Sequence, residues 1–182
     1  MTWVSLNATE DKKLNEMIGQ LGNLYTGAVA DTLDELGYHE QCLPSDIRPL
    51  ADTMKVAGPV YTVLGKPRHY DDGVDPRYRQ MDMLDAIPNN SVIVVEPGNE
   101  SSAAHWGELM TNTALQHGAK GIVINGGLRD SLQILDVGFP AFRKYHSPLT
   151  AAYRWNIDSF DIPIKVGNVT VSYTHLTLPT KA

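Results

Sequence analysis

The chain has 182 residues, of which 42% are hydrophobic and 20% are charged, so it is long enough to form one domain with a sizeable core. The formal net charge is −6 and the 15 Lys and Arg residues form no basic run, which argues against a nucleic-acid-binding surface. Cys42 is the single cysteine, which excludes an internal disulfide bond and fits a reducing compartment.

The sequence shows no membrane segment and no export signal. No apolar run approaches the length of a membrane span. The first residues, MTWVSLNATEDKK, lack the basic region followed by an apolar stretch that marks a signal peptide. We therefore expect a soluble cytoplasmic protein with no membrane partner.

The N-terminal third predicts two helices followed by a strand. Residues 7–22 and 26–37 read as helices that end at glycines, and Gly37 can adopt the left-handed conformation that closes a helix. Residues 55–65 alternate enough to predict a strand, in which Gly58-Pro59 indicates a bulge or a sheet edge.

After a polar loop, the centre of the chain alternates strands and helices. The loop is expected over residues 66–79, and the segments after it are a short helix (80–88), a strand (91–96), a helix (103–118), a strand (121–124), a helix (131–138) and a strand (139–142). This alternation predicts parallel strands joined by right-handed crossovers. The predicted fold class is a single α/β domain with βαβ units and no internal repeat.

The C-terminal segment departs from this pattern. Residues 172–182, SYTHLTLPTKA, show no turn or cap pattern and closely resemble a translated sequencing-adapter sequence. We expect a native domain over residues 1–171, which would continue past Val171, and a non-native tail over 172–182. The alternative is an ordinary flexible C-terminus.

The strongest candidate site lies where two strands end, because ligands bind outside the carboxyl ends of the strands in open parallel sheets. PGNESSAAHWGE follows Glu96, and NGGLRDS follows Ile124. If the two strands are neighbours, these loops face each other. Gly126 and Gly127 permit a tight turn and leave space for a ligand.

Three charged residues in these loops suggest chemistry. Arg129 offers a planar fork suited to a carboxylate, and Asp130 offers hard oxygens suited to Mg²⁺ or Mn²⁺. Glu108 could supply a second carboxylate, twenty residues before Arg129. A purely structural interpretation is also open: Asp130 would cap the following helix, Arg129 would pair with Asp130 or Asp136, and Glu108 would be a solvated helix acid.

Other candidates carry less weight. His105 and Glu108 stand three residues apart on the expected helix and could face one metal, although a helix histidine is more often packed or on the surface. Trp106 is expected to anchor that helix. The loop residues His69, Asp71 and Asp72 could bind a cation or simply be solvated. Cys42 has no activating neighbour in the sequence. The serine-hydrolase elbow, the P-loop and the dinucleotide-binding glycine motif are absent.

The sequence resembles the RraA-like family, most clearly in the segment HWGELMTNTALQHGAKGIVINGGLRD. The resemblance runs from about Gly27 to Val171 and includes VADTLDELG, IRPL, VAGPVYTV and GNVTV. That family contains the regulator of ribonuclease E activity and metal-dependent pyruvate aldolases that act on 4-hydroxy-4-methyl-2-oxoglutarate. The resemblance implies an α/β sandwich around a barrel-like sheet, and a homotrimer with sites between subunits.

The resemblance also implies roles for individual residues. Asp130 would be the ligand of a Mg²⁺ or Mn²⁺ ion, and Arg129 would contact the pyruvate portion of the substrate. Glu108 takes the place where the aldolases usually carry an aspartate. The substrate carboxylate would be held at the helix start by Gly107, Leu109 and Met110, the last two through their backbone amides.

The sequence departs from the aldolase pattern at three positions. Glu108 adds a methylene, Asn125 stands where an aspartate is common, and Gln133 stands where an acid is common. The regulator lacks the pair Arg129–Asp130 at this turn, so its presence favours an enzyme.

The function expected from this resemblance is a divalent-metal-dependent lyase. It would cleave small 2-oxo acids to pyruvate through a stabilised pyruvate enolate, as an aldolase or an oxaloacetate decarboxylase. The alternatives are a non-catalytic protein that regulates an RNA-processing enzyme, and a family member whose catalysis has decayed.

Overall fold

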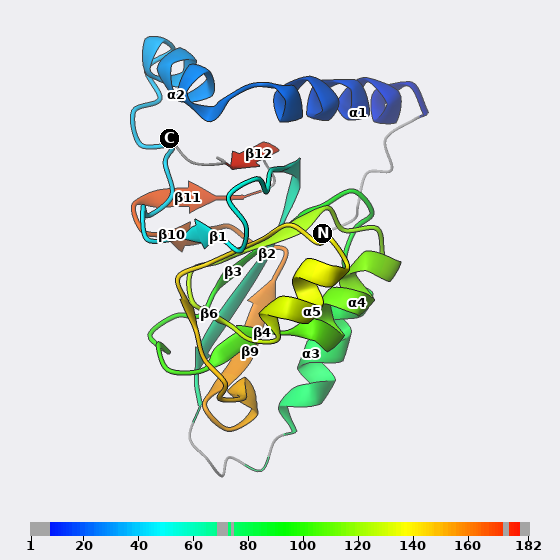
Figure 1. The fold of residues 1–182 in the computed structure, drawn as a ribbon, viewed down its shortest axis with the longest axis vertical. Coiled ribbons are helices and arrows are strands. Elements are labelled where there is room, and N and C mark those ends of the chain that lie inside the picture. The colour runs from blue at the N-terminus through cyan, green and yellow to red at the C-terminus, as the bar shows by residue number, and fades with distance from the viewer. Residues whose placement is uncertain (1–7, 69–72, 74, 173–174, 179–182) are drawn as a thin grey trace.

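A computed structural model describes residues 8–68, 73, 75–172 and 175–178, and Figure 1 shows the fold. The proposed cation cluster of His69, Asp71 and Asp72 lies outside the described residues.

Helices and short strands alternate along much of the chain. The helices are α1 (Ala8–Asn23), α2 (Thr26–Glu35), α3 (Pro76–Asp85), α4 (Glu108–Gln116) and α5 (Ser131–Asp136), with a 3-10 turn at Ala151–Tyr153. The strands are β1 (Arg48–Pro49), β2 (Val56–Pro67), β3 (Val92–Glu96), β4 (Ala104–Trp106), β5 (Gly121–Ile124), β6 (Gly127–Leu128), β7 (Ala141–Arg143), β8 (Tyr145–His146), β9 (Trp155–Phe160), β10 (Ile164–Val166), β11 (Val169–Val171) and β12 (His175–Leu178).

The main sheet has the strand order β1-β7-β5-β3-β2-β12, and β9 also pairs with β2. Its centre, formed by β2, β3, β5 and β7, is parallel, whereas β1, β9 and β12 run antiparallel to their neighbours. The predicted parallel α/β fold is confirmed. The predicted barrel-like sheet is not found, because the order of the described strands is open and closes no barrel.

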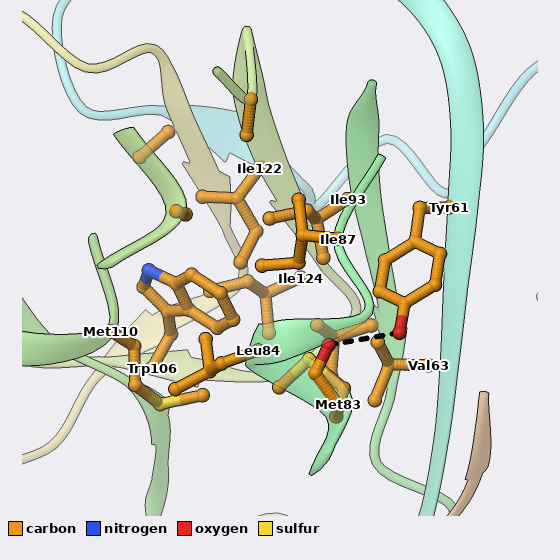
Figure 2. Close-up of a cluster of buried hydrophobic side chains, with 14 of the residues drawn as sticks. Tyr61, Val63, Met83, Leu84, Ile87, Ile93, Trp106, Met110, Ile122 and Ile124 are labelled. Atoms are coloured by element: carbon orange, nitrogen blue, oxygen red, sulfur yellow. Dashed lines mark hydrogen bonds between the residues drawn. The ribbon is translucent and has the colours of Figure 1, made fainter. Parts of the chain in front are cut away.

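Both faces of the central strands are buried, which is why VIVV and GIVI read as continuous apolar runs. Helices α3, α4 and α5 lie on one side of the sheet, and one cluster of buried side chains fills the space beneath them (Figures 1 and 2). In that cluster Tyr61 donates a hydrogen bond of 2.9 Å to the backbone oxygen of Met83. A second cluster packs the other face of the sheet against the β10–β11 hairpin.

A second, parallel sheet extends the first beyond its carboxyl ends. Strands β4, β6 and β8 follow β3, β5 and β7 along the chain, and they pair in the order β4-β6-β8. The segments after Glu96 and Ile124 therefore do lie side by side, as expected for the ends of neighbouring parallel strands.

The predicted helix over 103–118 is wrong in its first part. Residues 103–107 are all buried and include β4, and α4 begins only at Glu108, with Gly107 at its N-cap. Strand pairing with β6 outweighs the helical pattern here. His105 is consequently a strand residue, and it does not share a helix face with Glu108.

The predicted loop over 66–79 is also wrong at both ends, because β2 runs to Pro67 and α3 already begins at Pro76. The Asp75 carboxylate caps this helix by accepting a hydrogen bond of 3.0 Å from the backbone N–H of Arg77. Proline at the first helical position needs no hydrogen-bond acceptor, so Asp-Pro is a helix start.

The remaining expectations have mixed outcomes. Gly37 closes α2 with φ +87°, as predicted, and Tyr38 N–H donates back to Leu33. The bulge expected at Gly58-Pro59 is not found there, because the irregularity in β2 lies at Leu64–Gly65, where pairing with β9 shifts register. The edge alternative fits better, since pairing with β3 begins only at Val60 and residues 58–59 pair with β12.

Residues of the suspected tail form β12, which pairs with β2. The assignment of that tail as non-native stays a prediction. Among the described residues, the helices are too short or too polar to cross a membrane.

Candidate active site

A cavity of about 270 Å³ opens where the segments after β3 and β5 meet α3 and β9. Its walls combine apolar side chains with a few polar groups, as small-molecule sites usually do. The lining residues are Pro76, Arg77, Gln80, Ala104, His105, Trp106, Gly107, Leu109, Met110, Arg129, Asp130, Thr150, Ala151, Ala152, Trp155, Asn156 and Ile157.

Asp130 faces the start of α4. Its Oδ2 accepts a hydrogen bond of 3.0 Å from the backbone N–H of Glu108. A Cβ at Gly107 would lie 2.6 Å from the same oxygen, so glycine is needed for this close approach. Asp130 does stand at the N-cap position of α5, but its side chain makes no capping hydrogen bond. The capping interpretation of Asp130 is therefore wrong.

Arg129 lies beside this carboxylate. Its Nε is 3.5 Å from Asp130 Oδ2, so one of the two surface pairings considered for Arg129 is present. Its backbone N–H donates a hydrogen bond of 3.1 Å to the oxygen of Trp106, which ties the turn to β4. Nε makes the closest ionic contact, and the planar guanidinium carries further N–H donors that suit a carboxylate.

The first turn of α4 borders the cavity. The first amides of a helix have no acceptor within it, and that of Glu108 is given to Asp130. The next two backbone amides belong to Leu109 and Met110, and both residues line the cavity. Trp106 anchors this turn as expected, because its Nε1 donates a hydrogen bond of 2.9 Å to Thr111 Oγ1. Glu108 itself is half-buried and does not line the cavity.

His105, one of the lining residues, forms a buried pair with Glu100. Their Nε2 and Oε2 atoms are 2.8 Å apart, and their side chains are 0% and 8% exposed. Burial lowers the pKa of His105, and the charge of Glu100 only partly offsets this effect. Burial would raise the pKa of the Glu100 carboxyl, but hydrogen bonds from Ser102 and Ala103 outweigh it and hold that pKa below its usual range. The pair therefore consists of a neutral imidazole and a carboxylate.

Asn125 has a partner that explains its departure from the aldolase pattern. Its Nδ2 donates a hydrogen bond of 2.5 Å to Glu96 Oε2. Burial raises the pKa of Glu96, so an aspartate at position 125 would place a second charge against a carboxyl that is already partly desolvated. The amide joins the ends of β3 and β5 without that repulsion.

Four further residues line the cavity although sequence reasoning did not select them: Arg77, Gln80, Trp155 and Asn156. The Asp75-Pro76 helix start is a signal that could have placed the first two near the start of α3. The other two carry no local signal, because β9 reaches the site only through its antiparallel pairing with β2.

The donor set at Asp130 fits a hydrated Mg²⁺ or Mn²⁺ ion. The described residues hold no group of three or more His, Cys, Asp or Glu side chains able to bind a metal. Magnesium, however, is commonly held by one or two carboxylates and keeps several waters. The hydrogen bond from Glu108 and the closest approach of Arg129 are both to Oδ2 of Asp130, which makes Oδ1 the candidate oxygen for a cation.

The fold and this cavity define a mixed α/β protein with a site at the carboxyl ends of its parallel strands. The model of the RraA-like family, described as Aldolase/RraA, matches residues 26–177. Because the match covers most of the chain, the chain belongs to the RraA-like family.

Two curated relatives support this placement. Protein DlpA of Legionella pneumophila is 31% identical over 136 residues, which are 75% of this chain and 22% of DlpA. A Halalkalibacterium halodurans protein named "Putative 4-hydroxy-4-methyl-2-oxoglutarate aldolase" is 28% identical over 86% of this chain and 69% of its own length. The chain thus spans less than a quarter of DlpA.

Solved structures share the fold. A structure described under novel cellulases from microbes of the gut ecosystem has a TM-score of 0.82 and 34% identity, and it covers 91% of this chain and 78% of its own. Streptomyces coelicolor RraAS2, described as an unusual member of the RNase ES inhibitor RraA family, has a TM-score of 0.77 and 21% identity over 89% of this chain and 79% of its own.

Proposed function

We propose that the protein is a divalent-metal-dependent lyase that cleaves small 2-oxo acids to pyruvate. The observation that carries the proposal is the Asp130 carboxylate, held by a backbone amide at the start of α4, beside Arg129 and at the edge of a cavity. The family membership and the aldolase name of one relative support the same chemistry.

Asp130 is the proposed ligand of Mg²⁺ or Mn²⁺. When bound, such an ion supplies a Lewis acid that stabilises negative charge developing on the keto oxygen of a 2-oxo acid. Arg129 would pair with the carboxylate of the pyruvate portion, and the backbone at Gly107, Leu109 and Met110 would orient the same group.

The carbon–carbon bond next to the pyruvate portion then breaks. In a retro-aldol reaction, a water positioned by Glu108 accepts the proton of the substrate hydroxyl, the bond pair moves into a pyruvate enolate, and a carbonyl product leaves. The same water returns a proton to the enolate carbon to give pyruvate. Loss of carbon dioxide from oxaloacetate produces the same enolate, so one site would serve both reactions.

The cellulase description of one structural relative is less compatible with this cavity. Glycoside hydrolases generally use two carboxyl groups that flank the scissile bond. Among the described residues that line the cavity, Asp130 alone carries a carboxyl group. Lyase chemistry that uses the Asp130 carboxylate and the Arg129 guanidinium fits the lining better.

The second candidate is a non-catalytic protein that binds and regulates an RNA-processing enzyme. It is favoured by the RNase-inhibitor name of the Streptomyces neighbour and by a net charge of −6, which suits a basic partner. In that case Arg129 and Asp130 would be structural, and their substitution would leave partner binding intact. For either candidate we expect a homotrimer.

The deciding experiment measures pyruvate release from oxaloacetate and from 4-hydroxy-4-methyl-2-oxoglutarate with Mg²⁺, Mn²⁺ or a chelator. Wild type is compared with Arg129→Ala after circular dichroism and sedimentation confirm a folded oligomer. Metal-dependent release that the variant loses supports the lyase. No release from a folded wild-type oligomer overturns it and favours the regulatory candidate.

A further inference from the structure

The imidazole of His105 is placed between two loops of the site and bonds to both. Its Nε2 lies 2.8 Å from Glu100 Oε2, in the segment after β3. Its Nδ1 accepts a hydrogen bond of 3.1 Å from the backbone N–H of Gly127, in the turn that carries Arg129 and Asp130. Since Nδ1 is an acceptor, the proton resides on Nε2, and the ring is the neutral tautomer that donates to Glu100.

The hydrogen bond to Gly127 lies where the pairing between β4 and β6 is irregular. Ala104 pairs with Gly127 and Trp106 pairs with Leu128, and the register shifts between them, at His105. At the shift, the ring nitrogen of His105 takes the place of a backbone acceptor for the Gly127 N–H. Two residues further on, the Arg129 N–H donates to the Trp106 oxygen. The side chain of His105 therefore completes the attachment of this turn to β4.

The surroundings fix the ring in one orientation. The Trp155 ring packs edge-on against it, with centroids 5.1 Å apart, and Trp155 Nε1 donates a hydrogen bond of 3.1 Å to the Pro97 oxygen. A Cβ at Gly126 would lie 2.6 Å from His105 Nδ1, so the glycine turn closes directly onto the ring. Glu100 is fixed in turn by the backbone N–H groups of Ser102 and Ala103.

We propose that His105 is a positioning residue, which through its bond to Gly127 sets the place of Arg129 and Asp130 relative to the start of α4. His105 lines the cavity, but its side chain is 0% exposed and both ring nitrogens are engaged, so the ring neither donates a proton to the substrate nor accepts one. This inference rests on the proposed lyase function for its catalytic consequence. The attachment of the turn after β5 to β4 can be measured even in a protein without lyase activity.

Two substitutions separate the two bonds of the ring. In His105→Asn, the amide oxygen occupies the position of Nδ1 and can still accept from Gly127. In His105→Gln, the amide nitrogen occupies the position of Nε2 and can still donate to Glu100, but the Gly127 bond is lost. We expect His105→Gln to lower kcat by about 10- to 100-fold with KM nearly unchanged, as loss of a positioning contact does, and His105→Asn to retain most of the turnover.

The matched control is Tyr61→Phe, which also removes one buried side-chain hydrogen bond, at a residue that does not line the cavity. A second measurement is hydrogen exchange, by mass spectrometry, of a peptide over residues 125–130. His105→Gln is expected to speed exchange in this peptide, whereas His105→Asn and Tyr61→Phe are expected to match wild type.

The outcomes distinguish this inference from the lyase proposal. Faster exchange and lower kcat in His105→Gln alone support the positioning role. Unchanged exchange in His105→Gln overturns it, and so does faster exchange with unchanged kcat in an active protein. If wild type releases no pyruvate, the lyase proposal fails, and the exchange data alone decide whether His105 holds the turn.

Discussion

Asp130 stands at the N-cap of α5, yet its carboxylate accepts a hydrogen bond of 3.0 Å from the backbone of Glu108 at the start of α4. To face α4 it adopts the left-handed conformation, with φ +57° and ψ +39°. This conformation is uncommon for residues other than glycine, and such residues cluster at functional sites. The geometry thus favours a role for Asp130 in the cavity over one in its own helix.

Replacing Asp130 by Asn tests that role directly. Asn tolerates the left-handed conformation and its amide oxygen can still accept from Glu108, so we expect the free energy of unfolding to change by less than about 1 kcal/mol. A neutral amide is a weaker ligand for a hard cation, so pyruvate release is expected to fall by about 100-fold or more. Urea unfolding measures the first effect, and pyruvate release over a Mn²⁺ titration measures the second. An Asp130→Asn protein with wild-type turnover would exclude Asp130 as the ligand.

Gly107→Ala probes the close approach of Asp130 to α4. The φ of Gly107 is −159°, which any residue adopts, so the effect of the methyl group is purely steric. It would lie 2.6 Å from Asp130 Oδ2 and 3.1 Å from Arg129 Cγ, and both side chains must shift. We expect a loss of activity of about 100-fold, as for a 1 Å misplacement of reacting groups.

The control for this substitution is Gly19→Ala in α1, where an added Cβ meets no atom within 4 Å. It is expected to leave activity unchanged and to stabilise the helix by up to about 1 kcal/mol. Equal activity of the two variants in the pyruvate assay would contradict the steric argument.

The sequence predicted the parallel sheet because the strands at its centre are buried on both faces and carry unbroken apolar runs. The sequence also predicted that Arg129 and Asp130 lie near the start of α4, because strand ends and glycine turns leave local patterns. The error at residues 103–107 has a physical cause: β4 is held by pairing with a strand more than twenty residues away, and no local pattern records that pairing.

The buried pair of His105 and Glu100 could not be found by the same means. Five residues apart and on no common helix face, the two side chains meet because the segment after β3 folds back on itself through the amides of Ser102 and Ala103. Trp155 reaches the cavity only through the tertiary pairing of β9 with β2. Local sequence thus predicted the turn that carries Arg129 and Asp130. The residues that hold this turn in place are brought together only by tertiary contacts.

Substitutions of Glu108 test whether a glutamate can serve where the aldolases usually carry an aspartate. Glu108→Gln keeps the shape of the side chain but cannot accept a proton through water, so we expect kcat to fall by about 100-fold, the lower range of general acid–base contributions. Glu108→Asp keeps the charge and is expected to stay within about 10-fold of wild type, since water can bridge the missing methylene. Steady-state pyruvate release measures both, and equal turnover of Glu108→Gln and wild type would remove Glu108 from the mechanism.

The buried His105 also predicts how stability depends on pH. Because burial holds the pKa of His105 below its ordinary value, the unfolded chain binds this proton more readily than the folded protein does. The stabilising contribution is therefore fully present above about pH 6.5, the unfolded value, and is lost as the pH falls from there through the lower pKa of the folded state. The lowered pKa of Glu100 acts in the same direction, but only below about pH 4.3, where an unfolded glutamate takes up its proton.

Urea unfolding of wild type and His105→Asn between pH 8 and pH 5 isolates this linkage. Burial also lowers the pKa of His146, but that effect is common to both proteins and cancels in the difference. The stability advantage of wild type over His105→Asn should shrink as the pH falls below about 6.5, by at most about 1.4 kcal/mol per pH unit for one proton. Parallel stability curves would show that His105 takes up its proton equally in both states, which is incompatible with a buried neutral ring bonded to the Gly127 amide.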